Sequence, residues 1–152
     1  MANLGNFFPD DIKSDFASDK LKAGVVLRFF VTDTTPPKIK RIIIIAIEHS
    51  RILAATVFIN SEINPAIFSS EELRKLQYKL EYAKCDFLDH DSYVDCSEIK
   101  ERTADSLMKL LKSSPSVHLG ELCTEEFKAI KELIKGARTI PVRIKKKFSL
   151  FL

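Results

Sequence analysis

The chain has 152 residues, of which 45% are hydrophobic and 30% are charged. This composition is typical of soluble globular domains and excludes a chain that is disordered throughout, and the length suits one domain with one core. The net charge of +3 is too small by itself to indicate a nucleic-acid-binding protein. Five basic residues and no acid lie between Arg138 and Lys147. This basic segment either attracts phosphate backbones or acidic partners, or forms an ordinary solvated surface.

The cysteines and the apolar runs indicate the compartment. The chain has three cysteines, an odd number, and no two of them form a CxxC pair. A disulfide framework is therefore disfavoured, and a reducing environment is expected. The N-terminus has no apolar run of signal-peptide length, and the longest run, Ile42 to Ile47, has six residues, whereas about 20 are needed to cross a bilayer. We expect a cytoplasmic protein that does not enter the membrane.

The first half of the chain predicts strands. Residues 1–20 form a leader with one short helix near residues 11–18. Three segments that are rich in β-branched and aromatic residues follow, at residues 24–31, 41–48 and 51–60. A loop with two prolines separates the first two, and a short turn separates the last two. These segments predict a three-stranded meander.

The middle of the chain is ambiguous. Ser70 followed by two glutamates is typical of a helix start, which favours a helix over residues 71–79. Leu76, Tyr78 and Leu80 alternate with polar residues, however, which favours a strand in the second half of this region. Both interpretations stay open.

The last third predicts one strand and two helices. Residues 92–96 ("SYVDC") form the strand, and residues 104–112 ("ADSLMKLLK") form the first helix. The second helix follows Thr124, has glutamates in its first turn and ends at Gly136. The basic segment, residues 138–152, is either a late strand or a loose tail. The pattern as a whole predicts a mainly β domain with short helices over residues 21–137.

The stretch "DHDSYVDCSEI", residues 89–99, concentrates possible metal ligands. A calcium loop that began at Asp89 would place Val94 where the turn needs glycine and Lys100 where the bidentate carboxylate belongs, so an EF-hand is excluded. His90 and Cys96 are six residues apart, and no second pair has zinc-finger spacing. A strand with Val94 facing inward and carboxylates facing outward explains the pattern. Cys96 is then expected in the core and not as a nucleophile.

The order of these segments carries a resemblance. A strand "GVVLRFF" opens at Gly24, a polar loop leads into "KRIIIIAI", and "LAATVFINSEIN" follows. This order resembles the MazF/PemK family of toxin endoribonucleases over roughly residues 24–135, with residues 64–84 poorly matched. In the second half of the chain, six residues match the spacing of the family's later strand and short helix: Leu88, Asp91, Ser92, Val94, Ile99 and Leu107.

The resemblance implies a fold and a chemistry. The family fold is an SH3-like β-barrel with short helices and a C-terminal helix, usually as a homodimer. Its members cleave single-stranded RNA without a metal or cofactor and are held in check by an antitoxin protein. In this chemistry a base takes the 2′-hydroxyl proton, the oxygen attacks phosphorus, and a cation stabilises the developing charge.

Carried over to this chain, the resemblance implies a catalytic set. Arg41 falls at the position of the family's charge-stabilising cation. Its guanidinium suits a phosphorane because it is always charged and binds two oxygens at once. Ser61 or Asn60 falls at the family's Thr/Ser position. Ser92 falls on the serine of the later strand and is expected to contact RNA.

The expected RNA-binding surface is basic. Lys38 and Lys40 belong to the loop at residues 32–40, which is expected to line one cleft with Arg41 and Ser61. The basic segment adds Arg143, Lys145 and Lys146 as candidates for phosphate contacts.

The chain departs from the family pattern, and this keeps alternatives open. Ile42 replaces the family's proline, and Asn60 has no hydroxyl group. The main alternative is a non-catalytic module that binds nucleic acid or protein on the same barrel, and a purely structural subunit is a third. The chain has no tryptophan, and Phe29, Phe30 and Phe58 are expected in the core, so no base-stacking platform is evident.

Overall fold

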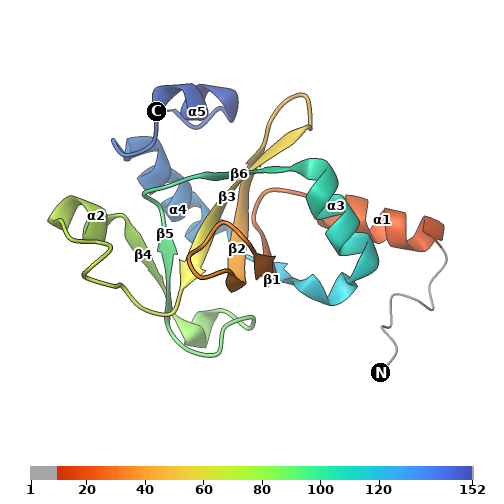
Figure 1. The fold of residues 1–152 in the computed structure, drawn as a ribbon, viewed down its shortest axis with the longest axis horizontal. Coiled ribbons are helices and arrows are strands. Elements are labelled where there is room, and N and C mark those ends of the chain that lie inside the picture. Colours follow the sequence, from red (N-terminus) through yellow and green to blue (C-terminus); the bar gives the residue numbers. More distant parts are fainter. Residues whose placement is uncertain (1–9, 152) are drawn as a thin grey trace.

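The computed structural model describes residues 10–151. Its centre is an antiparallel sheet that curls into a half-barrel (Figure 1). Hydrogen bonds join the strands in the order β4-β5-β3-β2-β1-β7. The strand β6 also pairs with β3, at residues 53–56, whereas β5 pairs with residues 59 and 60 of β3. The strands are β1 (Val25–Val31), β2 (Lys38–Ile47), β3 (Leu53–Asn60), β4 (Gln77–Leu80), β5 (Ser92–Asp95), β6 (Lys100–Thr103) and β7 (His118–Glu121).

Helices cover the two faces of this sheet (Figure 1). On one face α1 packs against α3, and their buried residues meet those of β1, β2 and β3. On the other face the buried residues of α4 meet those of the sheet. The helices are α1 (Asp10–Lys20), α2 (Glu71–Lys75), α3 (Ala104–Ser113), α4 (Thr124–Gly136) and α5 (Val142–Lys147), with short 3₁₀ turns at Tyr82–Lys84 and Pro115–Val117.

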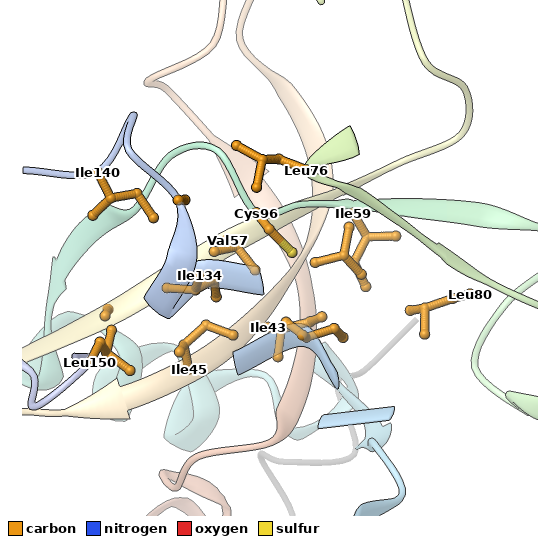
Figure 2. Packing of buried hydrophobic residues seen from close by; sticks show 14 of the residues in the cluster. Ile43, Ile45, Val57, Ile59, Leu76, Leu80, Cys96, Ile134, Ile140 and Leu150 are labelled. Atoms are coloured by element: carbon orange, nitrogen blue, oxygen red, sulfur yellow. The ribbon is translucent and has the colours of Figure 1, made fainter. Parts of the chain in front are cut away.

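The run of four isoleucines in β2 explains why the sheet needs cover on both faces. Successive side chains of a strand point to opposite faces. Ile42 and Ile44 therefore pack toward α1 and α3, whereas Ile43 and Ile45 pack toward α4. All four are at most 1% exposed. Figure 2 shows Ile43 and Ile45 beside Ile134 of α4.

Most of the expected elements are present. The meander β1-β2-β3 and the helices α1, α3 and α4 are confirmed. In the ambiguous middle region both interpretations hold in turn, because a five-residue helix, α2, is followed directly by the strand β4. The fold is mainly β with short helices, as expected.

The secondary structure that was expected for the basic segment is wrong. Residues 142–147 form the helix α5, not a strand or a loose tail. Ile144, Phe148 and Leu150 belong to the core cluster that also contains Ile134. The segment is basic on its outside but is anchored by its apolar residues.

No helix in the described part of the chain is long and apolar enough to span a membrane.

Candidate nucleic-acid interface

The residues singled out from the sequence lie on two faces of the sheet, because they alternate along β2. Lys38 and Lys40 share the face of Ile42, whereas Arg41 shares the face of Ile43. Asn60 is the direct cross-strand neighbour of Lys40, since Arg41 pairs with Ile59 in the register of β2 and β3. The expected single cleft that contains Arg41 is therefore divided between two surfaces.

The first surface is a hollow of about 360 Å³ at the start of β2 and the end of β3, which we name the Lys40 groove. Lys38, Lys40, Asn60 and Ser61 all line it, as does the loop at residues 33–35. These four side chains were expected at one site and are brought together. The other lining residues are Phe58, Glu62, Asn64, Ile67, Phe68, Asp95, Glu98 and Lys100.

Lys40 lies at the base of this groove. Its Nζ donates a hydrogen bond to Oδ1 of Asn60 and lies 5.4 Å from the centre of the Phe58 ring. Burial lowers the pKa of the Lys40 amine, and the neighbouring charge of Lys38 lowers it further, while Asp95 acts in the opposite direction. The amine therefore gives up its proton more readily than an exposed lysine.

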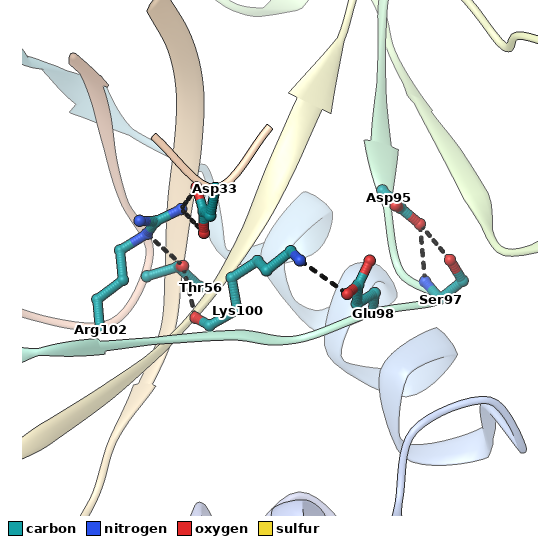
Figure 3. Close-up of polar contacts among 7 residues, drawn as sticks. All are labelled: Asp33, Thr56, Asp95, Ser97, Glu98, Lys100 and Arg102. Atoms are coloured by element: carbon teal, nitrogen blue, oxygen red, sulfur yellow. Dashed lines mark hydrogen bonds and ion pairs between the residues drawn. The ribbon is translucent and has the colours of Figure 1, made fainter. Parts of the chain in front are cut away.

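Arg102 of β6 supports one wall of the groove and was not singled out from the sequence. Its guanidinium carbon lies 5.6 Å from the ring centres of both Phe29 and Phe58. The same group donates to Oγ1 of Thr56 at 3.1 Å and forms an ion pair with Asp33 at 3.2 Å (Figure 3). No sequence motif marks this residue, because its partners come from β1, β3 and the loop after β1.

Asp95 is the buried acid at the far wall of the groove. Its Oδ1 accepts hydrogen bonds from the backbone and the hydroxyl group of Ser97, at 3.0 and 2.5 Å (Figure 3). It also accepts one from Nε2 of Gln77 at 3.0 Å. These three donors hold the carboxylate in place, so its role is to order the turn after β5.

The second surface is a block of four side chains on the face of Arg41, which we name the Arg41 face. In the antiparallel register Arg28 lies opposite Arg41, and Phe30 lies opposite Ile39. All four point to the same side of the sheet, since they are spaced by two along each strand. Phe30 is 59% exposed and Ile39 is 53% exposed. The expectation that Phe30 is a core residue is therefore wrong.

Arg41 is only partly engaged by the protein. Its Nη2 forms an ion pair with Oδ2 of Asp89 at 3.0 Å. Its Nε is buried and has no hydrogen-bond partner among residues 10–151. Arg28 is exposed and takes part in no ion pair within the described residues. Of the two guanidinium groups, only that of Arg41 is thus paired with a carboxylate among the described residues.

The loop before β5, which supplies Asp89 to Arg41, carries further polar groups. His90 follows Asp89 directly, and its Nδ1 lies 2.8 Å from the carbonyl oxygen of Asp91. Because a carbonyl only accepts, this contact places the ring proton on Nδ1 and leaves Nε2 free to accept one. Ser92 shares the face of Val94, but its hydroxyl group donates to the backbone oxygen of His90 at 3.0 Å.

The candidates of the basic segment lie on α5 and line neither surface. The amine of Lys145 donates to the carbonyl oxygens of Lys135 and Ala137, at 2.8 and 2.6 Å, so it satisfies the end of α4. Arg143 borders a separate hollow together with Glu98 and Glu101. Lys146 lines an apolar hollow beside Val142.

The cysteine and metal-site interpretations of the sequence can be compared with the structure. Cys96 is fully buried, and burial raises the pKa of its thiol to about 12, so it is the core residue that was expected. Within the described residues no group of three or more His, Cys, Asp and Glu side chains is arranged to hold a metal ion.

Comparisons with known proteins identify no relative: no protein-family model matches this chain, and no curated protein matches its sequence significantly.

Proposed function

We propose that the protein is a metal-independent endoribonuclease for single-stranded RNA and that the strand lies across the Arg41 face. The observation that carries the proposal is the direct cross-strand pairing of Arg28 with Arg41. Opposed residues in an antiparallel pair have Cβ atoms about 4.5–5.5 Å apart, and like charges at this distance destabilise the pair. A phosphate between them removes the repulsion and can accept hydrogen bonds from both guanidinium groups.

The apolar half of the Arg41 face suits the bases of the same strand. Phe30 and Ile39 lie next to the two arginines and are exposed. Proteins bind unpaired bases by stacking them on aromatic side chains while basic residues hold the backbone. Adjacent phosphate-binding and base-binding groups on one strand pair thus favour a single-stranded nucleic acid.

The cleavage step uses the 2′-hydroxyl group of the substrate. Nε2 of His90 takes the proton, the 2′-oxygen attacks phosphorus, and the 5′-oxygen leaves with a proton from solvent. The products are a 2′,3′-cyclic phosphate and a 5′-hydroxyl group. Arg41 and Arg28 stabilise the charge that develops on the phosphorane oxygens. Asp89 holds Arg41 in position through the 3.0 Å ion pair.

The direct test is incubation of the purified protein with single-stranded RNA in the presence of EDTA. We expect cleavage by the wild type, and a loss of at least about 100-fold in Arg41→Ala and in His90→Ala, as general acid–base and charge-stabilising groups usually contribute. Arg138→Ala is the matched control, because this arginine is 86% exposed and pairs only with Glu72. Equal cleavage by the wild type and Arg41→Ala would refute the assignment.

A second candidate is a non-catalytic binding module with the same surface. Two observations favour it: the guanidinium of Arg41 is already paired with Asp89, and Ser61 and Asn60 lie at the Lys40 groove, not beside Arg41. This candidate predicts RNA binding that depends on Arg28 and Phe30, with intact RNA recovered after long incubation.

The resemblance to MazF/PemK toxins adds a cellular role to the first candidate. A toxin of this kind acts as a homodimer and is neutralised by an antitoxin protein. We expect expression of the wild type to stop bacterial growth and expression of Arg41→Ala to leave growth unchanged. Growth arrest by both forms at equal protein levels would argue against an RNA-cleaving toxin.

A further inference from the structure

The Lys40 groove contains positive charge that the protein itself leaves unpaired. Its lining has three lysines, Lys38, Lys40 and Lys100. Lys100 pairs with Glu98 at 2.9 Å. Neither of the other two amines lies within ion-pair distance of a carboxylate in the described part of the chain, and Lys40 donates its hydrogen bond to the neutral amide of Asn60.

The acids of the groove are mostly engaged elsewhere. Asp33 pairs with Arg102, Glu98 pairs with Lys100, and Oδ1 of Asp95 accepts three hydrogen bonds from Ser97 and Gln77. Of the four acids, only the exposed Glu62 has no such partner among the described residues. Asp95 keeps its negative charge, because its three donors are neutral, and this charge acts on Lys40. Lys38 and Lys40 nevertheless form no ion pair with any of these acids, so both amines are available to an added anion.

We propose that the Lys40 groove is a phosphate-binding site in which Lys38 and Lys40 bridge one phosphate group, separate from the Arg41 face. The two lysines are two residues apart on one face of β2, which places their Cβ atoms about 6.7 Å apart. Two flexible amines at this spacing can donate to oxygens on opposite sides of one tetrahedral phosphate. The hydroxyl group of Ser61 lines the same hollow and supplies a further donor.

The half-buried position of Lys40 makes this site stronger than a pair of surface lysines. A charge that is partly removed from water gains more from an opposite charge than an exposed one does. The amine of Lys40 has three donors and uses one on Asn60, so donors remain for a ligand. Phe58 and Arg102 hold the wall behind the amine, so little ordering is needed on binding.

The phosphate can come from a small molecule or from a nucleic-acid backbone, and the test separates these sources. Binding is measured by calorimetry with inorganic phosphate, with AMP, with adenosine as the ligand without phosphate, and with a single-stranded deoxyoligonucleotide. The deoxyoligonucleotide has no 2′-hydroxyl group and cannot be cleaved by the proposed ribonuclease chemistry. Saturable binding of phosphate and AMP identifies a small-molecule site, and saturation by the oligonucleotide alone identifies a backbone site; both support the proposal.

The variants are Lys40→Gln and Lys38→Gln, with Lys109→Gln as the matched control. Lys109 lies on α3, is 75% exposed and pairs with Asp105, so it does not line the groove. We expect at least about a tenfold loss of affinity in Lys40→Gln, a smaller loss in Lys38→Gln and no change in the control, in line with charge-assisted hydrogen bonds. Absence of binding by any phosphate-bearing probe, or equal affinity in the wild type and Lys40→Gln, would overturn the proposal.

Two further measurements keep this test separate from that of the proposed function. Affinity in the wild type should fall as the pH rises through the lowered pKa of Lys40, because the neutral amine no longer attracts the phosphate. Phosphate affinity that is lost in Arg41→Ala belongs to the Arg41 face, whereas phosphate affinity that is lost in Lys40→Gln belongs to the groove. If phosphate binding depends on Arg41 and not on Lys40, the groove assignment fails while the ribonuclease proposal stands.

Discussion

Neighbouring residues on one strand have different roles here because the strand alternates its side chains. Lys40 and Arg41 are adjacent in sequence, and both were expected in one cleft. In the sheet they face opposite sides, and each meets a different partner, Asn60 for the lysine and Asp89 for the arginine. The sequence thus indicated basic residues near the start of β2, but not which of them share a face of the sheet.

Lys40 gives a prediction for stability against pH. Its pKa in the folded protein is lower than 10.5, so the folded state binds its proton less tightly than the unfolded state does. Below the folded pKa, the partly buried charge of Lys40 lowers the free energy of unfolding by its full amount. As the pH rises from the folded pKa to 10.5, the amine loses its proton in the folded state, and this destabilisation disappears. We expect Lys40→Met to unfold at a higher temperature than the wild type at pH 7, with the difference shrinking at alkaline pH. Thermal unfolding at several pH values checks this, and a less stable variant at pH 7 would contradict it.

Arg102 gives a second prediction at this scale. Arg102→Ala removes the donor to Thr56, the ion pair with Asp33 and the contacts with two aromatic rings. We expect a loss of about 2–3 kcal/mol in the free energy of unfolding, since the arginine side chain is only 14% exposed. Urea unfolding measures it, with Arg138→Ala as the exposed control. A loss no larger than that of the control would show that the contacts are not stabilising.

Among the elements, α3 begins at a cap that the sequence supplies. Oγ1 of Thr103 accepts a hydrogen bond from the backbone nitrogen of Ser106 at 3.2 Å. Thr103→Ala should lower the free energy of unfolding by about 1 kcal/mol. Thr103→Ser keeps a hydroxyl group at the cap, so its free energy of unfolding should stay close to that of the wild type. Equal stability of the two variants in urea unfolding would show that the hydroxyl group contributes nothing.

The contact between α1 and β7 should be sensitive to acid. His118 meets the ring of Phe16 edge to face at 6.2 Å, and its Nε2 is buried without a hydrogen-bond partner. Burial lowers the pKa of His118, and Lys20 lowers it further; Lys22 also lowers it, while Glu121 and Asp19 oppose the shift. The unfolded histidine therefore takes up a proton first, and stability should fall as the pH drops below 6.5 toward the lower folded pKa. His118→Gln should remove this part of the pH dependence of the unfolding temperature.

At the scale of the whole molecule, the C-terminal segment closes the core. Ile144, Phe148 and Leu150 are between 1% and 9% exposed and pack in the cluster of α4. Leu150→Ala should cost about 3–5 kcal/mol in urea unfolding, as large-to-small core substitutions do, whereas Lys146→Gln should change stability little. Deletion of residues 142–152 removes all three side chains and should leave no folded protein. A stable truncated form would contradict the packing of α5.

The sequence by itself determined the type and order of most elements. The isoleucine run, the proline loop and the apolar stripes of the helices are local patterns, and local patterns report which surfaces must be buried. They were sufficient for the meander, for α3 and α4, and for Cys96 as a core residue. The resemblance of the segment order to the MazF/PemK family, and not a local pattern, singled out Lys38, Lys40, Asn60 and Ser61, which do share one groove.

The tertiary structure alone decided which distant residues meet. The pairing of Arg28 with Arg41 depends on the register between β1 and β2, and the position of Arg102 between two rings depends on β6 joining β3. The exposure of Phe30 and the burial of Leu150 depend on which parts of the sheet the helices cover. Register and helix packing are set by contacts between segments far apart in the chain, and no local pattern encodes them.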